Sequence, residues 1–186
     1  MKQSTRKIAL SAAVAALYAV LSYFGNIFGL TYGPIQVRLS EALCVLPFLF
    51  PETTPGLFVG CLLANLLSPY GVADVVFGSL ATLIAAVVTA KTKNRYLAPL
   101  PPVVANGLII GALISWYELG GFRRGFWTAF AVNGAWVALG EAVACYVLGG
   151  LVLQFLPRSP FFRRMIPEKR LEYLDRTAPK KRENAS

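Results

Sequence analysis

The sequence predicts an all-α integral membrane protein, a bundle of six transmembrane helices with both termini in the cytoplasm. The first observation is composition: of 186 residues, 56% are hydrophobic and only 15% are charged, and the mean hydropathy is +0.57. A soluble core of this size would be too small to hide so much apolar surface. The second observation is that the apolar residues form six blocks, and the third is that basic residues gather at the ends and in one linker.

The first three blocks differ in length. The block at 8–30 follows three basic residues and exceeds the roughly 20 helical residues that a hydrocarbon core requires. A cleavable signal peptide has a similar basic start but a shorter apolar centre, so we expect a retained first helix. The blocks at 38–50 and 55–69 are short, and both complete tilted helices and the arms of a re-entrant hairpin fit their lengths.

Three further blocks, at 72–90, 102–117 and 125–156, complete the expected six crossings. Residues 1–157 are thus expected to form one transmembrane substrate-binding domain. Residues 158–186 form a basic cytoplasmic tail that mixes prolines and charges. This composition is typical of a short interfacial segment, placed here at 163–174, followed by disorder, with lipid anchoring as its simplest role.

Orientation follows from lysine and arginine, because basic residues beside apolar helices resist translocation. The N-terminus carries three, the linker after the fourth block carries three, and the tail from Pro157 carries nine. The opposite face would hold only Arg38, Arg123 and Arg124. Both termini are therefore expected in the cytoplasm.

The formal net charge of +9 raises the question of nucleic acid. The basic residues lie where they would face anionic lipid headgroups, so membrane lipid is the expected partner and nucleic acid is not. Cys44, Cys61 and Cys145 lie inside apolar blocks, are odd in number and lack metal-ligand spacing. They are interpreted as small packing residues.

Polar side chains within the blocks indicate the candidate site. An ionisable group near the bilayer centre costs about 2.5–3.5 kcal/mol on insertion scales, so each one is a functional candidate. Nearly all of them fall in the predicted outer half. In the last block, Asn133, Trp136, Gly140 and Glu141 are spaced to share one helical face. The predicted substrate-binding residues are Arg38, Glu41, Asn65, Asn133, Trp136 and Glu141.

Arg38 and Glu41 are three residues apart and could pair on one side of a helical turn that lines a cavity. The alternative is a capping and topology role at the interface. Asp74 and Glu118 lie near the expected outer water, where solvation accounts for them.

The candidate side chains limit the chemistry of a ligand. Carboxylates accept two parallel hydrogen bonds from an N–H/NH₂ edge, an arginine or asparagine donates to a carbonyl oxygen, and an indole stacks on a flat ring. A planar heterocycle of guanine type fits this set. An amino acid or a thiamine-like cation also fits.

The first block contains small residues four apart, which let another backbone approach closely in lipid. Two explanations are open: docking of a partner, or packing against the chain's own helices. The candidate docking residues are Ala9, Ala12, Ala13 and Ala16.

Several kinds of machinery are absent from the sequence. It has no GxxxxGK[ST] phosphate loop, no histidine and no cysteine cluster, so no ATPase, zinc or nucleophile site is expected, and no cofactor. The chain also lacks evident repeats and is small for an alternating-access carrier. Energy for transport would come from partners.

The runs Tyr32–Gly71 and Asn133–Ala142, which contain VRLSEAL and GEA, resemble the queuosine-precursor transporter family, QueT, over about residues 8–157. The resemblance implies a substrate-binding S component of an energy-coupling factor (ECF) transporter in the bacterial cytoplasmic membrane, and not an enzyme. It would capture a 7-deazaguanine precursor from outside and deliver it through a transmembrane coupling subunit and two ABC-type ATPases. Such S components use an alanine face of the first helix for docking, which corresponds here to Ala9/Ala13 and Ala12/Ala16.

Other functions fit the same residues. The chain could be an S component for a different vitamin-like solute, or a stand-alone proton-linked carrier or membrane enzyme that uses Glu41 and Glu141. A purely structural membrane subunit would bind no specific small ligand.

Overall fold

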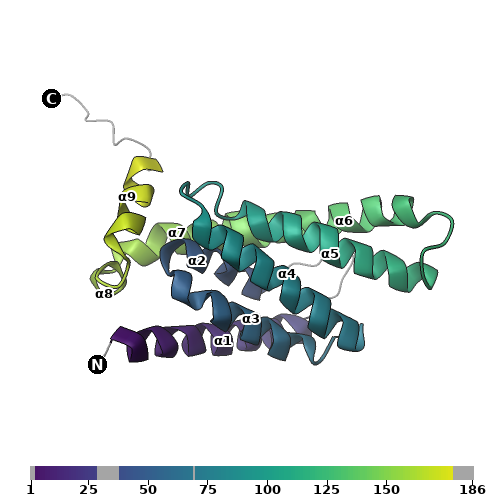
Figure 1. Ribbon diagram of the computed structural model, residues 1–186, viewed down its shortest axis with the longest axis horizontal. Helices are drawn as coiled ribbons and strands as arrows, with labels where there is room; N and C mark the ends of the chain where they lie inside the picture. Colours follow the sequence, from purple (N-terminus) through teal and green to yellow (C-terminus); the bar gives the residue numbers. More distant parts are fainter. Residues whose placement is uncertain (1–2, 29–37, 69, 178–186) are drawn as a thin grey trace.

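The computed structural model describes residues 3–28, 38–68 and 70–177, and every regular element within these ranges is helical (Figure 1). Four stretches are long and apolar enough to cross a membrane: Ser4–Ile27, Gly71–Lys91, Leu100–Leu119 and Phe126–Arg158. The predicted all-α fold is confirmed. Six crossings and two cytoplasmic termini stay predictions, because four stretches of the described residues have spanning length.

Helix α1 (Gln3–Ile27) packs along α3 (Thr54–Asn65) at very short range. A Cβ atom at Gly60 would lie 2.8 Å from both the Ala15 carbonyl oxygen and the Tyr18 Cβ atom. A side chain at this position would therefore push the helices apart. Close backbone contact of this kind replaces the hydrophobic effect, which does not drive association between helices in lipid.

The segment expected as a helix at 38–50 has a different form. Leu39–Val45 is a 3₁₀ helix (η1) and Leu46–Leu49 is a single α-helical turn (α2). Together they cover only about 20 Å of a hydrocarbon core about 30 Å thick. Residues 40–50 are all buried, which explains the fold: irregular backbone is tolerated at membrane depth when protein encloses it.

The chain then turns through Pro51–Thr53 (η2) into α3, which ends at Asn65, four residues before the predicted end. The predicted boundaries at Leu30 and Pro69, and the loop at 29–37, lie outside the described residues.

Helices α5 (Leu100–Leu119) and α6 (Phe126–Ala142) form a closely packed helical hairpin. This hairpin extends beyond the other helices at one end of the molecule (Figure 1). Helix α4 (Gly71–Lys91) packs against both α3 and α5. Gly120, with φ of 63°, ends α5 in the left-handed conformation that glycine adopts without strain.

The last predicted crossing is one continuous helical stretch with a local irregularity. After α6 the chain forms a π-helical segment at Val143–Leu148 (η3) and continues as α7 (Gly149–Phe155). Such π segments are rare and occur frequently at functional sites. Here η3 packs against η1 in the centre of the bundle.

Leu156–Arg158 (η4) leads into the basic tail, which contains two helices, α8 (Pro160–Arg163) and α9 (Glu168–Thr177), rather than the single segment expected at 163–174. Pro167 separates them, because proline cannot continue the hydrogen-bond pattern of a preceding helix. Both lie at the same end of the molecule as the start of α1 (Figure 1).

Helix α9 is attached to the bundle. Ile166 and Leu174 are buried in the main apolar cluster, and the Arg170 guanidinium donates hydrogen bonds to the carbonyl oxygens of Thr92 (3.0 Å) and Ala90. Burial lowers the pKa of the Arg170 guanidinium below its usual value, and the neighbouring Tyr173 opposes that shift. The guanidinium thus satisfies carbonyl groups at the end of α4 that have no partner within the helix.

The apolar core lies where η1 and α2 are enclosed by α1, α3, α7 and the tail. Its fully buried large side chains include Tyr18, Phe48, Leu49, Phe50 and Leu57. Many large apolar side chains are instead exposed, as lipid-facing residues are, for example Val20, Leu67, Val72, Leu108 and Val147.

Candidate functional site

A buried polar cluster joins the start of η1 to α3 and α4. The Arg38 guanidinium lies 3.5 Å from the Asp74 carboxylate and donates a hydrogen bond to the Asn65 side-chain oxygen over 3.3 Å. The Asn65 amide donates to the Asp74 backbone carbonyl over 3.0 Å. Three residues from three elements therefore hold one another in place.

The expectation that outer water solvates the Asp74 carboxylate is wrong, because Asp74 is fully buried. Neither of its carboxylate oxygens accepts a hydrogen bond from any residue that the structure describes. A buried acceptor of this kind normally has a partner, so Asp74 has hydrogen-bonding capacity to offer a bound molecule.

Glu41 belongs to a second group of polar atoms. Its carboxylate accepts hydrogen bonds from the Tyr18 hydroxyl and from the Cys44 thiol, over 2.9 Å. The ion pair that the structure gives Arg38 is thus with Asp74, while Glu41 faces α1, which corrects the expected pairing of Arg38 with Glu41. Each carboxylate oxygen of Glu41 still has one further lone pair.

Glu141 approaches the same region from α6. The Cys145 thiol contacts both the Glu141 carboxylate, over 3.7 Å, and the Glu41 backbone carbonyl, over 3.3 Å. The π-helical segment that follows Glu141 positions Cys145 for these contacts.

The remaining two predicted site residues take part in none of these contacts. The Asn133 amide donates to Ser115 over 3.0 Å and to the exposed Glu118 carboxylate over 2.7 Å. Trp136 is 46% exposed, whereas Gly140 and Glu141 are buried. Of the six, Arg38 and Asn65 are thus in direct contact, Glu41 and Glu141 both contact Cys145, and Asn133 and Trp136 take part in neither set of contacts.

The face of α1 that carries the candidate docking residues is open. A different side of α1 faces α3: there Ser11 contacts Gly56, and Ala15 and Tyr18 contact Gly60. The four alanines proposed for docking are all exposed: Ala9, Ala12, Ala13 and Ala16.

Sequence reasoning missed several contributors to the cluster. Asp74 carried a usable signal, because it is an ionisable group at the start of an apolar block. Tyr18 lies in an alanine-rich helix, and nothing in its spacing linked it to Glu41. The cysteines are buried as expected, and in addition their sulfur atoms contact polar groups of the cluster.

The chemistry available is binding rather than bond making. One guanidinium is accompanied by three buried carboxyl groups, Asp74, Glu41 and Glu141, so the cluster has an excess of hydrogen-bond acceptors. Among the described residues, no group of three or more histidine, cysteine, aspartate or glutamate side chains could hold a metal ion.

Charged groups enclosed in a multi-pass bundle of apolar helices define a membrane protein that handles a polar solute. The family is specific: a model of the QueT transporter family matches residues 8–158, so the chain belongs to this family. The family is one of transport proteins and not of enzymes, and the family resemblance drawn from VRLSEAL and GEA is confirmed.

The chain is similar to the queuosine precursor transporter QueT of Lactococcus lactis subsp. cremoris, with 37% identity over 83 residues. The match covers 45% of this chain and 48% of that protein. The chain thus spans about half the length of this curated relative. No solved structure matches the chain.

Proposed function

We propose that this protein is the substrate-binding subunit of an ATP-driven ECF-type importer and captures a 7-deazaguanine precursor of queuosine. Its family and the name of its relative support a queuosine precursor as the solute. In this proposal the protein lies in the bacterial cytoplasmic membrane with six crossings, both termini in the cytoplasm, and the polar cluster toward the outside.

The observation that carries the proposal is the excess of buried carboxyl groups over the single Arg38 guanidinium, which pairs with Asp74. A 7-deazaguanine offers an N–H and an NH₂ group side by side, which two oxygens of one carboxylate can accept together. Its carbonyl oxygen requires a donor, which the Arg38 guanidinium supplies; this group already donates to the Asn65 side-chain oxygen over 3.3 Å. Asp74, Glu41 and Glu141 supply the acceptors.

The exposed alanine face of α1 supports a partner in the same membrane. Four small side chains over two turns allow a partner helix to approach the backbone closely. In the proposal that partner is a transmembrane coupling subunit, which connects to two ABC-type ATPases and so supplies the energy for release.

The deciding experiment is native mass spectrometry of the protein purified from its own membrane, followed by calorimetry with 7-cyano- and 7-aminomethyl-7-deazaguanine. We expect a co-purified deazapurine and a single binding site. Failure of both compounds to bind, or a different solute in the mass spectrum, would overturn the assignment of substrate.

A second candidate function is a stand-alone proton-linked carrier. The two buried carboxyl groups of Glu41 and Glu141 favour it, since such groups form proton relays in membrane transporters. The Cys145 thiol contacts the Glu141 carboxylate and the Glu41 backbone carbonyl. Liposomes that contain this chain alone and a pH gradient separate the two functions. Uptake of the precursor without any ATPase would favour the carrier, and uptake only with the coupling subunit and ATPases would favour the importer.

A further inference from the structure

A cavity lies between the start of α1 and the tail, away from the polar cluster. Its volume is about 750 Å³, and its lining is Arg6, Ala9, Leu10, Pro160, Phe161, Phe162, Arg164 and Met165. This volume is within the usual range of small-molecule sites, about 300–1,000 Å³. The proposed substrate site does not use it.

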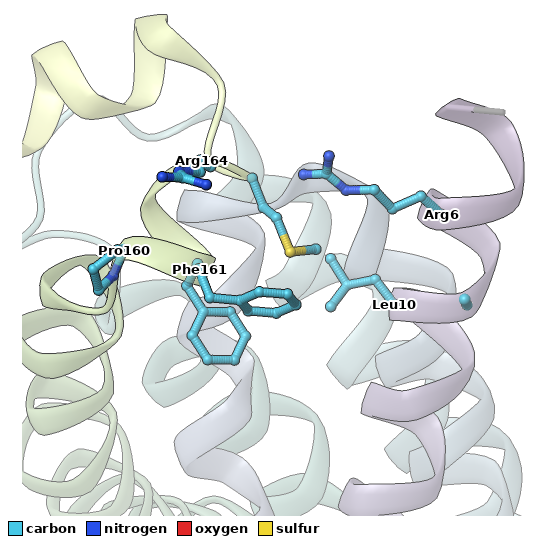
Figure 2. Close-up of a pocket in the computed structure, with 8 residues that line it drawn as sticks. Arg6, Leu10, Pro160, Phe161 and Arg164 are labelled. Carbon is cyan, nitrogen blue, oxygen red and sulfur yellow. The ribbon is translucent and has the colours of Figure 1, made fainter. Parts of the chain in front are cut away.

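The cavity is divided by chemistry. Figure 2 shows the Arg6 and Arg164 guanidinium groups on one side of the opening, with the apolar side chains of Leu10 and Phe161 beneath them. Both arginines are exposed. No acidic side chain is among the described residues that line the cavity. Two positive charges above an apolar hollow form a site for an amphiphile with an anionic head.

The depth of these residues matches a lipid leaflet. The first spanning stretch begins at Ser4, so Arg6 lies at the membrane boundary, and Ala9 and Leu10 lie about one helical turn deeper. One apolar side chain of the lining, Phe161, is 68% exposed and so available to lipid. An acyl chain could therefore enter from the bilayer while its phosphate stays at the level of the arginines.

We propose that this cavity binds an anionic phospholipid, with its phosphate between Arg6 and Arg164 and an acyl chain against Leu10, Phe161 and Met165. Arginine favours this ligand because its planar guanidinium donates two parallel hydrogen bonds to phosphate oxygens. The lipid would connect α8 to α1 and hold the tail at the membrane surface. A protein segment is the competing occupant, because Ala9 belongs to both the cavity and the docking face.

The test is native mass spectrometry of the full chain in detergent, titrated with phosphatidylglycerol and, separately, with phosphatidylcholine. We expect wild-type protein to bind phosphatidylglycerol preferentially, and Arg6→Gln/Arg164→Gln to bind it about thirtyfold more weakly, since each of the two basic residues near an anionic surface contributes about 1 kcal/mol. Phosphatidylcholine binding should not change.

Two further variants make the result specific. Lys93→Gln/Lys169→Gln removes the same charge from exposed positions outside the cavity and should retain wild-type affinity. Phe161→Glu keeps both arginines but places a carboxylate beneath them, and should abolish phosphatidylglycerol binding. Thermal unfolding confirms that each variant is folded.

Equal phosphatidylglycerol binding by the wild type and the Arg6/Arg164 variant would overturn the lipid site. If the Arg6/Arg164 variant also lost co-purification of partner subunits while its lipid binding stayed unchanged, the cavity would be assigned to a protein interface instead. These measurements contain no deazaguanine, so failure of the proposed substrate leaves their outcome unaffected.

Discussion

The Arg38 guanidinium lies 3.5 Å from the Asp74 carboxylate, with 11% and 1% of the two side chains exposed. Arg38 comes directly before η1 and Asp74 lies in the first turn of α4, so the ion pair joins two segments 36 positions apart in the chain. Burial of both charges is costly unless each compensates the other, which makes the pair sensitive to loss of one member.

Asp74→Asn should destabilise the protein by about 3–5 kcal/mol, because it leaves the Arg38 charge without its buried counterion. Thermal unfolding in detergent measures the effect. The double variant Arg38→Met/Asp74→Leu should recover most of the lost stability while losing ligand affinity. An unchanged melting temperature for Asp74→Asn would show that the pair does not stabilise the fold.

Glu41→Gln and Glu141→Gln should each weaken binding of a 7-deazaguanine precursor by about 10- to 100-fold. A hydrogen bond to a charged group contributes about 1.5–3 kcal/mol, and the amide replaces one acceptor oxygen with a donor. Isothermal calorimetry on the purified variants gives the affinities. Glu118→Gln, an exposed carboxylate bonded to Asn133, is the matched control and should bind as the wild type does. Wild-type affinity in both Glu41 and Glu141 variants would remove these carboxylates from the site.

The 7-aminomethyl precursor should bind about tenfold more tightly than the 7-cyano precursor. Three buried carboxyl groups accompany one guanidinium, so a ligand with a positive charge compensates the excess of acidic groups. Competition calorimetry with the two compounds measures the ratio. Asp74→Asn should reduce the preference, and tighter binding of the neutral 7-cyano compound would contradict the argument.

Ala13→Trp should block assembly with the coupling subunit and leave ligand affinity unchanged. Ala13 is exposed on α1, and an indole there would prevent the close helix contact that small residues permit. Co-purification from cells that express the whole importer measures assembly. Val20→Trp places the same ring at another exposed position of α1 and should assemble normally. Normal yields of partner subunits with Ala13→Trp would place the docking surface elsewhere.

Arg170→Ala should loosen α9 from the bundle. The guanidinium bonds the carbonyl oxygens of Ala90 and Thr92 and lies 5.7 Å from the centre of the Tyr173 ring. We expect trypsin to cleave within 158–176 about tenfold faster than in the wild type. Lys169→Ala, at an exposed neighbouring position, should cleave no faster than the wild type. An equal rate for Arg170→Ala would mean that Ile166 and Leu174 alone hold the helix.

The sequence by itself determined the class of the protein and its family. An apolar block long enough to cross the hydrocarbon core as a helix has few other folded forms, so composition and block length identified a membrane protein. The local runs VRLSEAL and GEA sufficed for the family because they are short and contiguous. Single ionisable residues in apolar blocks also led to Arg38, Glu41 and Glu141, since their insertion cost stands out without a structure.

Only the tertiary structure decided which polar groups meet. Helical periodicity describes neighbours on one helix, so it grouped Asn133 and Trp136 with Glu141 and paired Arg38 with Glu41. The partners that the structure gives these charges, Asp74 and Tyr18, come from other helices, and long-range packing is not encoded in any local spacing. The 3₁₀ form of η1 has the same origin: burial by the surrounding helices replaces the lipid that would otherwise require a regular α-helix.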